Sequence, residues 1–141
     1  MDTNALDDDV FLALFMDMRL PKAEFKHAQH VQLAWILLTR HPLLDAIQRF
    51  RTGLKAFAVY RQVPELYNET ITCFYLLLIR ERMDRMAGRS VWRTFTEANP
   101  DIFGHPKILL EQYYPGGLAL TEQAKQAFYP PPVQEAQEYA A

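Results

Sequence analysis

The spacing of apolar residues is the feature that most constrains how this chain can fold. Apolar residues recur every three or four positions, first in a run formed by Val10, Phe11, Leu14, Phe15 and Met18. That spacing places them on one face of an α-helix. No sustained alternation of apolar and polar residues, and no Asn-Gly or Asp-Gly turn, indicates a strand or a hairpin. The sequence therefore predicts an all-α protein, a compact single-domain bundle of five to seven helices without a sheet.

Capping residues, prolines and glycines set the expected helix boundaries. Helices are expected from the acidic cluster at 7–9 to Pro21, over 23–39, after Pro42, over 68–87 with Gly88 as the stop, after Ser90, over 106–113, and over 121–128 beyond a turn at 115–117. The helix over 68–87 is apolar on nearly every side in its middle, which is typical of a helix at the centre of a bundle.

The chain length and the distribution of prolines indicate one domain. The chain has 141 residues, a common size for one hydrophobic core, and shows neither a repeat nor a linker. Pro130, Pro131 and Pro132 interrupt the last predicted helix. We therefore expect one helical domain over residues 1–129 and a loose, proline-rich C-terminal tail over 130–141.

The charge distribution limits the expected partners, and the cysteine content limits the possible disulfides. The formal net charge of -2 gives no overall basic field, so nucleic acid is not an expected partner. The middle of the chain is rich in arginine, which indicates either a solvated surface or an anionic substrate or partner. The single cysteine, Cys73, cannot form an internal disulfide. No signal peptide and no long apolar run is visible, so we expect a cytoplasmic protein without a membrane partner. A homodimer is an open alternative to a monomer.

Two histidines form the most informative pair in the sequence. His27 and His30 are three residues apart, so both project from one face of the helix expected over 23–39. At about 100° per residue they share a stripe with Val31, Ala34 and Leu38, and we expect both to be largely buried on the same wall of one cavity.

Inward-facing histidines need partners, because a buried polar group without a hydrogen bond costs a few kcal/mol. A metal ion, a carboxylate or water in a cavity would each serve, and imidazole is both a common metal ligand and an acid–base group. The alternative is that each histidine hydrogen-bonds a backbone carbonyl of a neighbouring helix.

A second polar stretch lies at the start of the helix expected over 68–87. Asn68 is a typical N-cap, and Glu69 is a first-turn carboxylate that suits the helix dipole. Glu69 could instead face the histidine pair, and we expect it within hydrogen-bonding or metal-sharing reach of both rings. Cys73 follows one turn later and either shares that face or acts as a small hydrophobic core residue. Tyr67 either lines a pocket or covers the core.

These segments together resemble a family of small bacterial helical proteins. The pattern that carries the resemblance is Leu20-Pro21, Phe25-x-His27-x-x-His30-Val31, Ala34-Trp35 and Tyr67-x-Glu69-Thr70-x-Thr72, with a looser match at Tyr113-Tyr114 and the proline-rich end. Members of the family typically have histidine before the Glu-Thr pair, where this chain has Asn68. The resemblance implies that His27, His30, Asn68 and Glu69 form one site, and it implies no particular reaction.

The sequence therefore leads to two functional hypotheses. The first is a small enzyme acting on a small polar organic molecule, with His27, His30 and Glu69 as catalytic residues and Asn68, Thr70, Tyr67 and Cys73 around the substrate. The same His27, His30 and Glu69 could hold a divalent metal, either Fe, Mn or Zn, or they could do acid–base work without metal. The alternative is a non-catalytic helical module that binds a ligand or a partner and whose histidines are structural.

Overall fold

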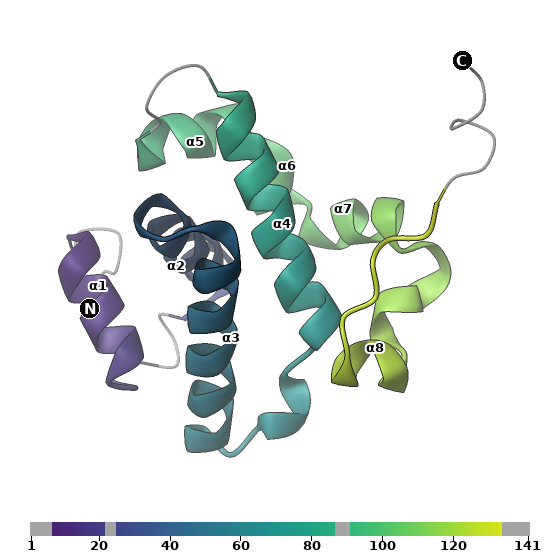
Figure 1. The fold of residues 1–141 in the computed structure, drawn as a ribbon, viewed down its shortest axis with the longest axis horizontal. Helices are drawn as coiled ribbons and strands as arrows, with labels where there is room; N and C mark the ends of the chain where they lie inside the picture. The colour runs from purple at the N-terminus through teal and green to yellow at the C-terminus, as the bar shows by residue number, and fades with distance from the viewer. Residues whose placement is uncertain (1–6, 22–24, 87–90, 134–141) are drawn as a thin grey trace.

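The protein is all-helical, as the apolar spacing predicts. The computed structural model describes residues 7–21, 25–86 and 91–133, and within these ranges it contains eight α-helices, two 3-10 segments and no strand (Figure 1). The elements, in chain order, are α1 (Asp8–Met16), α2 (His27–Arg40), α3 (Leu43–Tyr60), η3 (Pro64–Leu66), α4 (Glu69–Arg85), α5 (Trp92–Ala98), α6 (Pro100–Gly104), α7 (Pro106–Tyr113), η4 (Pro115–Leu120) and α8 (Glu122–Gln126).

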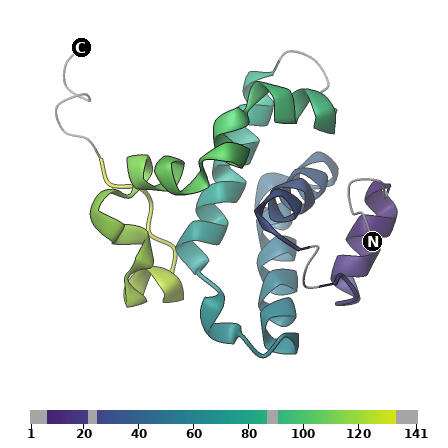
Figure 2. The same ribbon diagram turned by 180° about the vertical axis from the view of Figure 1, so that it is seen from behind.

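Three long helices form the centre of the molecule. α2, α3 and α4 pack against one another, and α1 lies on the outer side of α2 and α3. Of the short elements after residue 91, α7, η4 and α8 lie on the side of α4 away from α2 and α3, with α8 against α4 (Figure 2). By contrast, α5 lies on the same side of α4 as α2, where Trp92 packs against Trp35. α4 is therefore covered on two sides, which is why its middle can be apolar all round.

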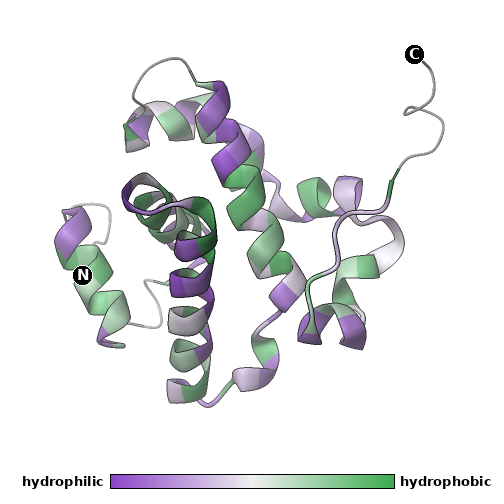
Figure 3. Ribbon diagram, viewed as in Figure 1, coloured by the Kyte–Doolittle hydropathy of each residue, from purple (hydrophilic) through white to green (hydrophobic). Residues whose placement is uncertain are grey.

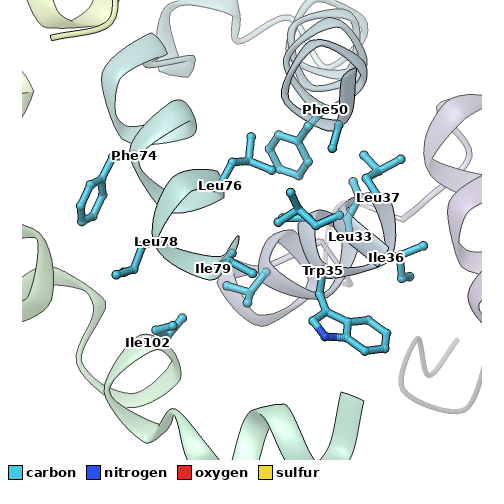
Figure 4. Close-up of a cluster of buried hydrophobic side chains, with 14 of the residues drawn as sticks. Leu33, Trp35, Ile36, Leu37, Phe50, Phe74, Leu76, Leu78, Ile79 and Ile102 are labelled. Carbon is cyan, nitrogen blue, oxygen red and sulfur yellow. The ribbon is translucent and has the colours of Figure 1, made fainter. Parts of the chain in front are cut away.

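The core is made chiefly by α2 and α4. Leu76 and Ile79 of α4 point toward α2 and Phe50 of α3, whereas Phe74 and Leu78 point to the other side (Figure 4). Hydropathy follows this arrangement, with hydrophobic residues along the middle of α4 and polar residues toward its C-terminal end (Figure 3).

α2 is more enclosed than its sequence pattern indicates. Every residue from 31 to 38 is buried, including Gln32, which the helical stripe placed on the side away from the core. The reason is that α2 packs against α1, α3 and α4, and Trp92 of α5 packs against Trp35, so several neighbouring helices enclose it.

Side-chain caps begin three of the helices where the sequence indicates. The side chains of Asp7, Asn68 and Thr121 accept backbone N–H bonds at the starts of α1, α4 and α8, at 2.9, 2.9 and 3.1 Å. Each bond satisfies an otherwise unpaired donor of the first turn.

Several predicted boundaries are wrong. α1 ends at Met16 rather than at Pro21, because Met18 adopts a left-handed backbone with φ 57°. α2 begins at His27, with Phe25 and Lys26 outside it, whereas its predicted start at 23 lies outside the described residues. The predicted stop at Gly88 and the predicted start at Ser90 also lie outside them.

The C-terminal part contains more helices than expected. Pro100, Pro106 and Pro115 each occupy a first-turn position, so the chain restarts short helices where the sequence indicated fewer. Gly116 and Gly117 have φ 72° and 75°, which supplies the expected turn inside η4. This fragmentation raises the α-helix count in the described part to eight, above the predicted five to seven.

The segment after α8 is anchored to α4. Thr70 donates to the carbonyl of Ala127 at 2.9 Å and accepts from the N–H of Tyr129 at 3.1 Å. Tyr114 donates to the carbonyl of Tyr129 at 2.6 Å. The chain is non-helical from residue 127 to 133, and the rest of the predicted tail, 134–141, lies outside the described residues.

None of the helices in the described ranges combines the length and the apolar character needed to cross a bilayer.

Candidate functional site

A cavity of about 360 Å³ lies between α2, α3, η3 and the first half of α4. Figure 1 shows how η3 joins α3 to α4 at one end of this region. Most of the side chains around the cavity are apolar. The polar ones belong to His27, His30, Arg61, Tyr67, Asn68, Thr72 and Tyr75. The volume lies within the range of small-molecule sites, about 300–1,000 Å³.

The structure brings His27 and His30 to one wall of this cavity, together with Val31 and Ala34. The start of α2 at His27 does not change this, since residues 27, 30, 31 and 34 still lie on one helical face. His27 and His30 both have intermediate exposure, because they lie at the start of α2, at the edge of the core, and burial is deep enough at the His30 ring to lower its pKa.

His27 is held by the backbone of a neighbouring helix. Its Nε2 lies 2.8 Å from the carbonyl oxygen of Ile102 in α6. A carbonyl oxygen can only accept, so Nε2 carries the hydrogen and donates it. The ring also packs edge-on against Tyr75, at 5.5 Å between centroids. His27 thus has the backbone partner that the structural alternative described.

His30 has a different environment. Its ring packs edge-on against Phe25, at 4.0 Å between centroids, and within the described ranges it makes no side-chain hydrogen bond. Burial, followed by the effect of nearby His27, lowers the pKa of His30 from 6.5 to about 4. At neutral pH the cavity therefore contains an uncharged imidazole.

Glu69 pairs with another helix instead of the histidines. Its carboxylate accepts from Arg51 Nε at 3.0 Å and also accepts from Arg51 Nη2 and from the Tyr67 hydroxyl. Burial alone would raise the pKa of Glu69, but hydrogen bonds from Arg51 and Tyr67 and the charges of Arg51 and Lys55 outweigh it and lower that pKa. Glu69 is neither hydrogen-bonded nor ion-paired to a described histidine, and it does not line the cavity.

The position of Glu69 on α4 explains this separation. The cavity face of α4 carries Ile71, Thr72, Tyr75 and Ile79. At about 100° per residue, Glu69 lies roughly a quarter turn from the centre of that face, toward α3 and Arg51. The expected reach between Glu69 and the histidine pair is therefore not found.

The remaining predicted site residues divide between the cavity and the scaffold. Asn68 and Tyr67 line the cavity, but the Asn68 amide also caps α4 and donates to the carbonyl of Ala119 at 2.8 Å. Thr70 and Cys73 do not line it. Thr70 anchors the segment after α8 through both of its hydrogen bonds. Cys73 is buried, and burial followed by the charge of Glu69 raises the pKa of its thiol, as expected for an inert core cysteine.

The predicted set of metal ligands is not assembled. Nε2 of His27 donates to a backbone carbonyl, and the Glu69 carboxylate is occupied by Arg51 and Tyr67. Across the described ranges, no three His, Cys, Asp or Glu side chains are grouped to hold an ion. The donor set does not fit Fe, Mn or Zn bound by His27, His30 and Glu69.

Arg61 is a charged cavity residue that sequence reasoning did not single out. It is the C-cap of α3, and it lines the cavity beside Phe57, with Cζ 4.9 Å from the centroid of that ring. A signal was present, because Arg61 continues the apolar stripe of Leu54, Phe57 and Ala58 at helical spacing. A charged residue that continues a buried stripe has an unusual position, since most charges lie on the solvent face.

Comparisons of the chain with protein-family models, with curated proteins and with solved structures find no match. The resemblance to a bacterial helical family, the homodimer and the cytoplasmic location therefore stay predictions.

Proposed function

We propose that this protein binds a small organic molecule in the cavity between α2, α3 and α4. The observation that carries the proposal is the combination of a volume of about 360 Å³, walls that are mostly apolar, and a few polar residues among those walls. Ligand sites commonly have this composition, because apolar walls supply affinity and a few polar groups set the orientation. At about 30 Å³ per water molecule, the volume corresponds to roughly a dozen water-sized groups.

The neutral His30 ring gives this cavity a group that can accept or donate one hydrogen bond. His27 and Tyr75 are less free, since each already donates to a backbone carbonyl, of Ile102 and of Pro106. Of these three residues, we therefore assign polar contact with the ligand first to His30, with His27 and Tyr75 serving mainly as a fixed wall.

Acid–base catalysis is the second candidate. It is favoured by the His30 imidazole, which lines the cavity without a side-chain hydrogen bond to the described residues. A pKa of about 4 makes this ring a weak proton acceptor at neutral pH, because a general base works best when its pKa lies near the working pH. Binding is accordingly the first proposal and catalysis the second.

A substitution that fills the cavity should abolish binding. Ala58 lines the cavity, so Ala58→Phe places a ring in the space that a ligand would occupy. We expect the affinity for phenylacetamide, a neutral aromatic probe, to fall by about tenfold or more, which corresponds to about 1.4 kcal/mol. Ligand-observed NMR of the purified protein measures this loss.

Ala56→Phe is the matched control. Ala56 lies in the same helix but is exposed and does not line the cavity, so this variant should bind like the wild type. Equal binding by the Ala58→Phe and wild-type proteins, or no binding by the wild type, would contradict the proposed function.

A further inference from the structure

We propose that the ligand of this cavity is a carboxylic acid with an apolar body, and that Arg61 binds its carboxylate. This inference rests on the proposed function, because it names the chemical class of the ligand bound in the same cavity. Arg61 is the one arginine among the described residues that line the cavity, and its positive charge is the reason for expecting a carboxylate.

The Arg61 guanidinium is fixed in place but incompletely paired. Its Nη2 donates to the carbonyl oxygen of Leu20 at 2.6 Å, and the group lies over the face of Phe57. Its Nε–H is buried, and no acceptor for it is found among the described residues. A guanidinium has five N–H donors, so donors remain for an incoming oxygen.

Charge balance gives the second argument. No Asp or Glu is among the residues that line the cavity, so nothing on its described walls neutralises Arg61. By contrast, each arginine within α3, α4 and α5 forms an ion pair with a carboxylate, and these arginines are Arg49, Arg51, Arg80, Arg82, Arg85 and Arg93. A cation beside an apolar cavity whose described walls carry no opposite charge favours an anionic ligand, because the attraction between charges is stronger beside apolar walls than in bulk water.

The walls next to Arg61 indicate the rest of the ligand. Phe57 packs edge-on against Phe25, at 4.8 Å between centroids, and both rings line the cavity. Across from them, α4 supplies Ile71, Leu76 and Ile79. Such walls suit an aromatic or branched aliphatic body that extends from the carboxylate, and burial of that body contributes about 25 cal/mol per Å².

His30 and Tyr67, which also line the cavity, do not add positive charge. The His30 ring is uncharged at neutral pH, since its pKa is lowered to about 4, and burial raises the pKa of Tyr67, whose hydroxyl donates to Glu69. One guanidinium matches the single charge of a carboxylate and can bind it through two parallel hydrogen bonds. A phosphate would bring more charge than this one cation balances, so we commit to a carboxylate.

A matched pair of probes tests this assignment. Phenylacetate and phenylacetamide have nearly the same shape but differ in charge at pH 7. We expect the wild-type protein to bind phenylacetate about tenfold more tightly than phenylacetamide, by calorimetry or ligand-observed NMR. In Arg61→Gln this preference should disappear while the binding of phenylacetamide is retained.

Two further variants keep the test falsifiable. Arg49→Gln changes an exposed arginine of the same chain that pairs with Asp45, and it should keep the wild-type preference. Arg61→Lys keeps the positive charge but loses the planar guanidinium, so it should keep part of the preference for phenylacetate. This variant tests the assignment even if Arg61→Gln folds poorly.

The outcomes separate the two proposals. Equal affinity of the wild type for the two probes, or a preference for phenylacetate that persists in Arg61→Gln, would overturn the carboxylate assignment and leave the proposed binding function intact. Absence of binding of either probe to the wild type would count against the cavity as a ligand site. Loss of the acid preference in Arg61→Gln alone supports the assignment.

Discussion

Glu69→Gln is expected to lower the free energy of unfolding by about 2–3 kcal/mol. The Glu69 side chain is only 12% exposed, and it joins α4 to α3 through two hydrogen bonds from Arg51. Removing the negative charge leaves the Arg51 guanidinium, itself 25% exposed, without its partner. The cost is large because charged groups that are partly removed from water lose a charge-assisted hydrogen bond and cannot fully regain hydration.

The same substitution elsewhere in α4 provides the control. Glu81 pairs with Arg85 one turn away, but its side chain is 51% exposed. Glu81→Gln should therefore cost about 0.5 kcal/mol or less, as surface pairs within a helix do. Urea unfolding at pH 7 measures both values.

This comparison also separates two roles for Glu69. If Glu69 were only catalytic, its substitution would change the free energy of unfolding little. The pairing with Arg51 instead makes Glu69 a structural link between α4 and α3. Equal, small losses for Glu69→Gln and Glu81→Gln would show that the ion pair with Arg51 does not stabilise the fold.

Mild acid should destabilise the protein through His30. In the folded chain the pKa of His30 is about 4, because of burial and of nearby His27, whereas its value in the unfolded chain is near 6.5. Between these values the unfolded chain binds a proton that the folded chain does not, so stability falls as the pH falls below about 6.5. The loss should reach about 2 kcal/mol at pH 5 and about 3 kcal/mol in full, below about pH 4.

The direction of the Glu69 pKa shift places its effect in a different pH range. The pKa of Glu69 is lowered from 4.5, so its stabilising contribution is present above about 4.5 and is lost only as the pH falls below that value. A comparison of unfolding free energies at pH 7 and pH 5 therefore reports mainly on His30 and little on Glu69.

Two variants test whether His30 causes the loss of stability in mild acid. His30→Gln removes the titrating ring, so this variant should lose about 2 kcal/mol less than the wild type between pH 7 and pH 5. His105→Gln changes an exposed histidine away from the cavity and should keep the wild-type loss. An identical loss in the wild type and in His30→Gln would contradict the lowered pKa of His30.

Local patterns in the sequence were sufficient to predict the helical class and several helix starts. Apolar spacing in α1 marks the buried Phe11 and Phe15, although Val10 of the same run is exposed. Asp7 and Asn68 cap helices where their side chains can satisfy the first free N–H groups. The same reasoning placed His27 and His30 on one helical face, and that face does line the cavity. These features depend on residues three or four apart, which a sequence specifies directly.

Boundaries and burial were predicted less well where distant contacts decide them. Gln32 is buried in a helix that packs against α1, α3 and α4, and no local pattern records those contacts. The C-terminal part breaks into short helices at Pro100, Pro106 and Pro115, because each proline starts a turn that packing against the rest of the molecule then retains.

The partners of the site residues were decided by tertiary structure alone. Glu69 has a strong local explanation as a first-turn carboxylate, yet its charge is balanced by Arg51, 18 residues away. His27 donates to the carbonyl of Ile102, 75 residues away, and Arg61 reaches the carbonyl of Leu20, 41 residues away. The sequence determines which face of a helix a side chain occupies, because helical geometry repeats locally. Which groups meet across helices depends on how those helices pack, and packing is settled by the burial of the whole core.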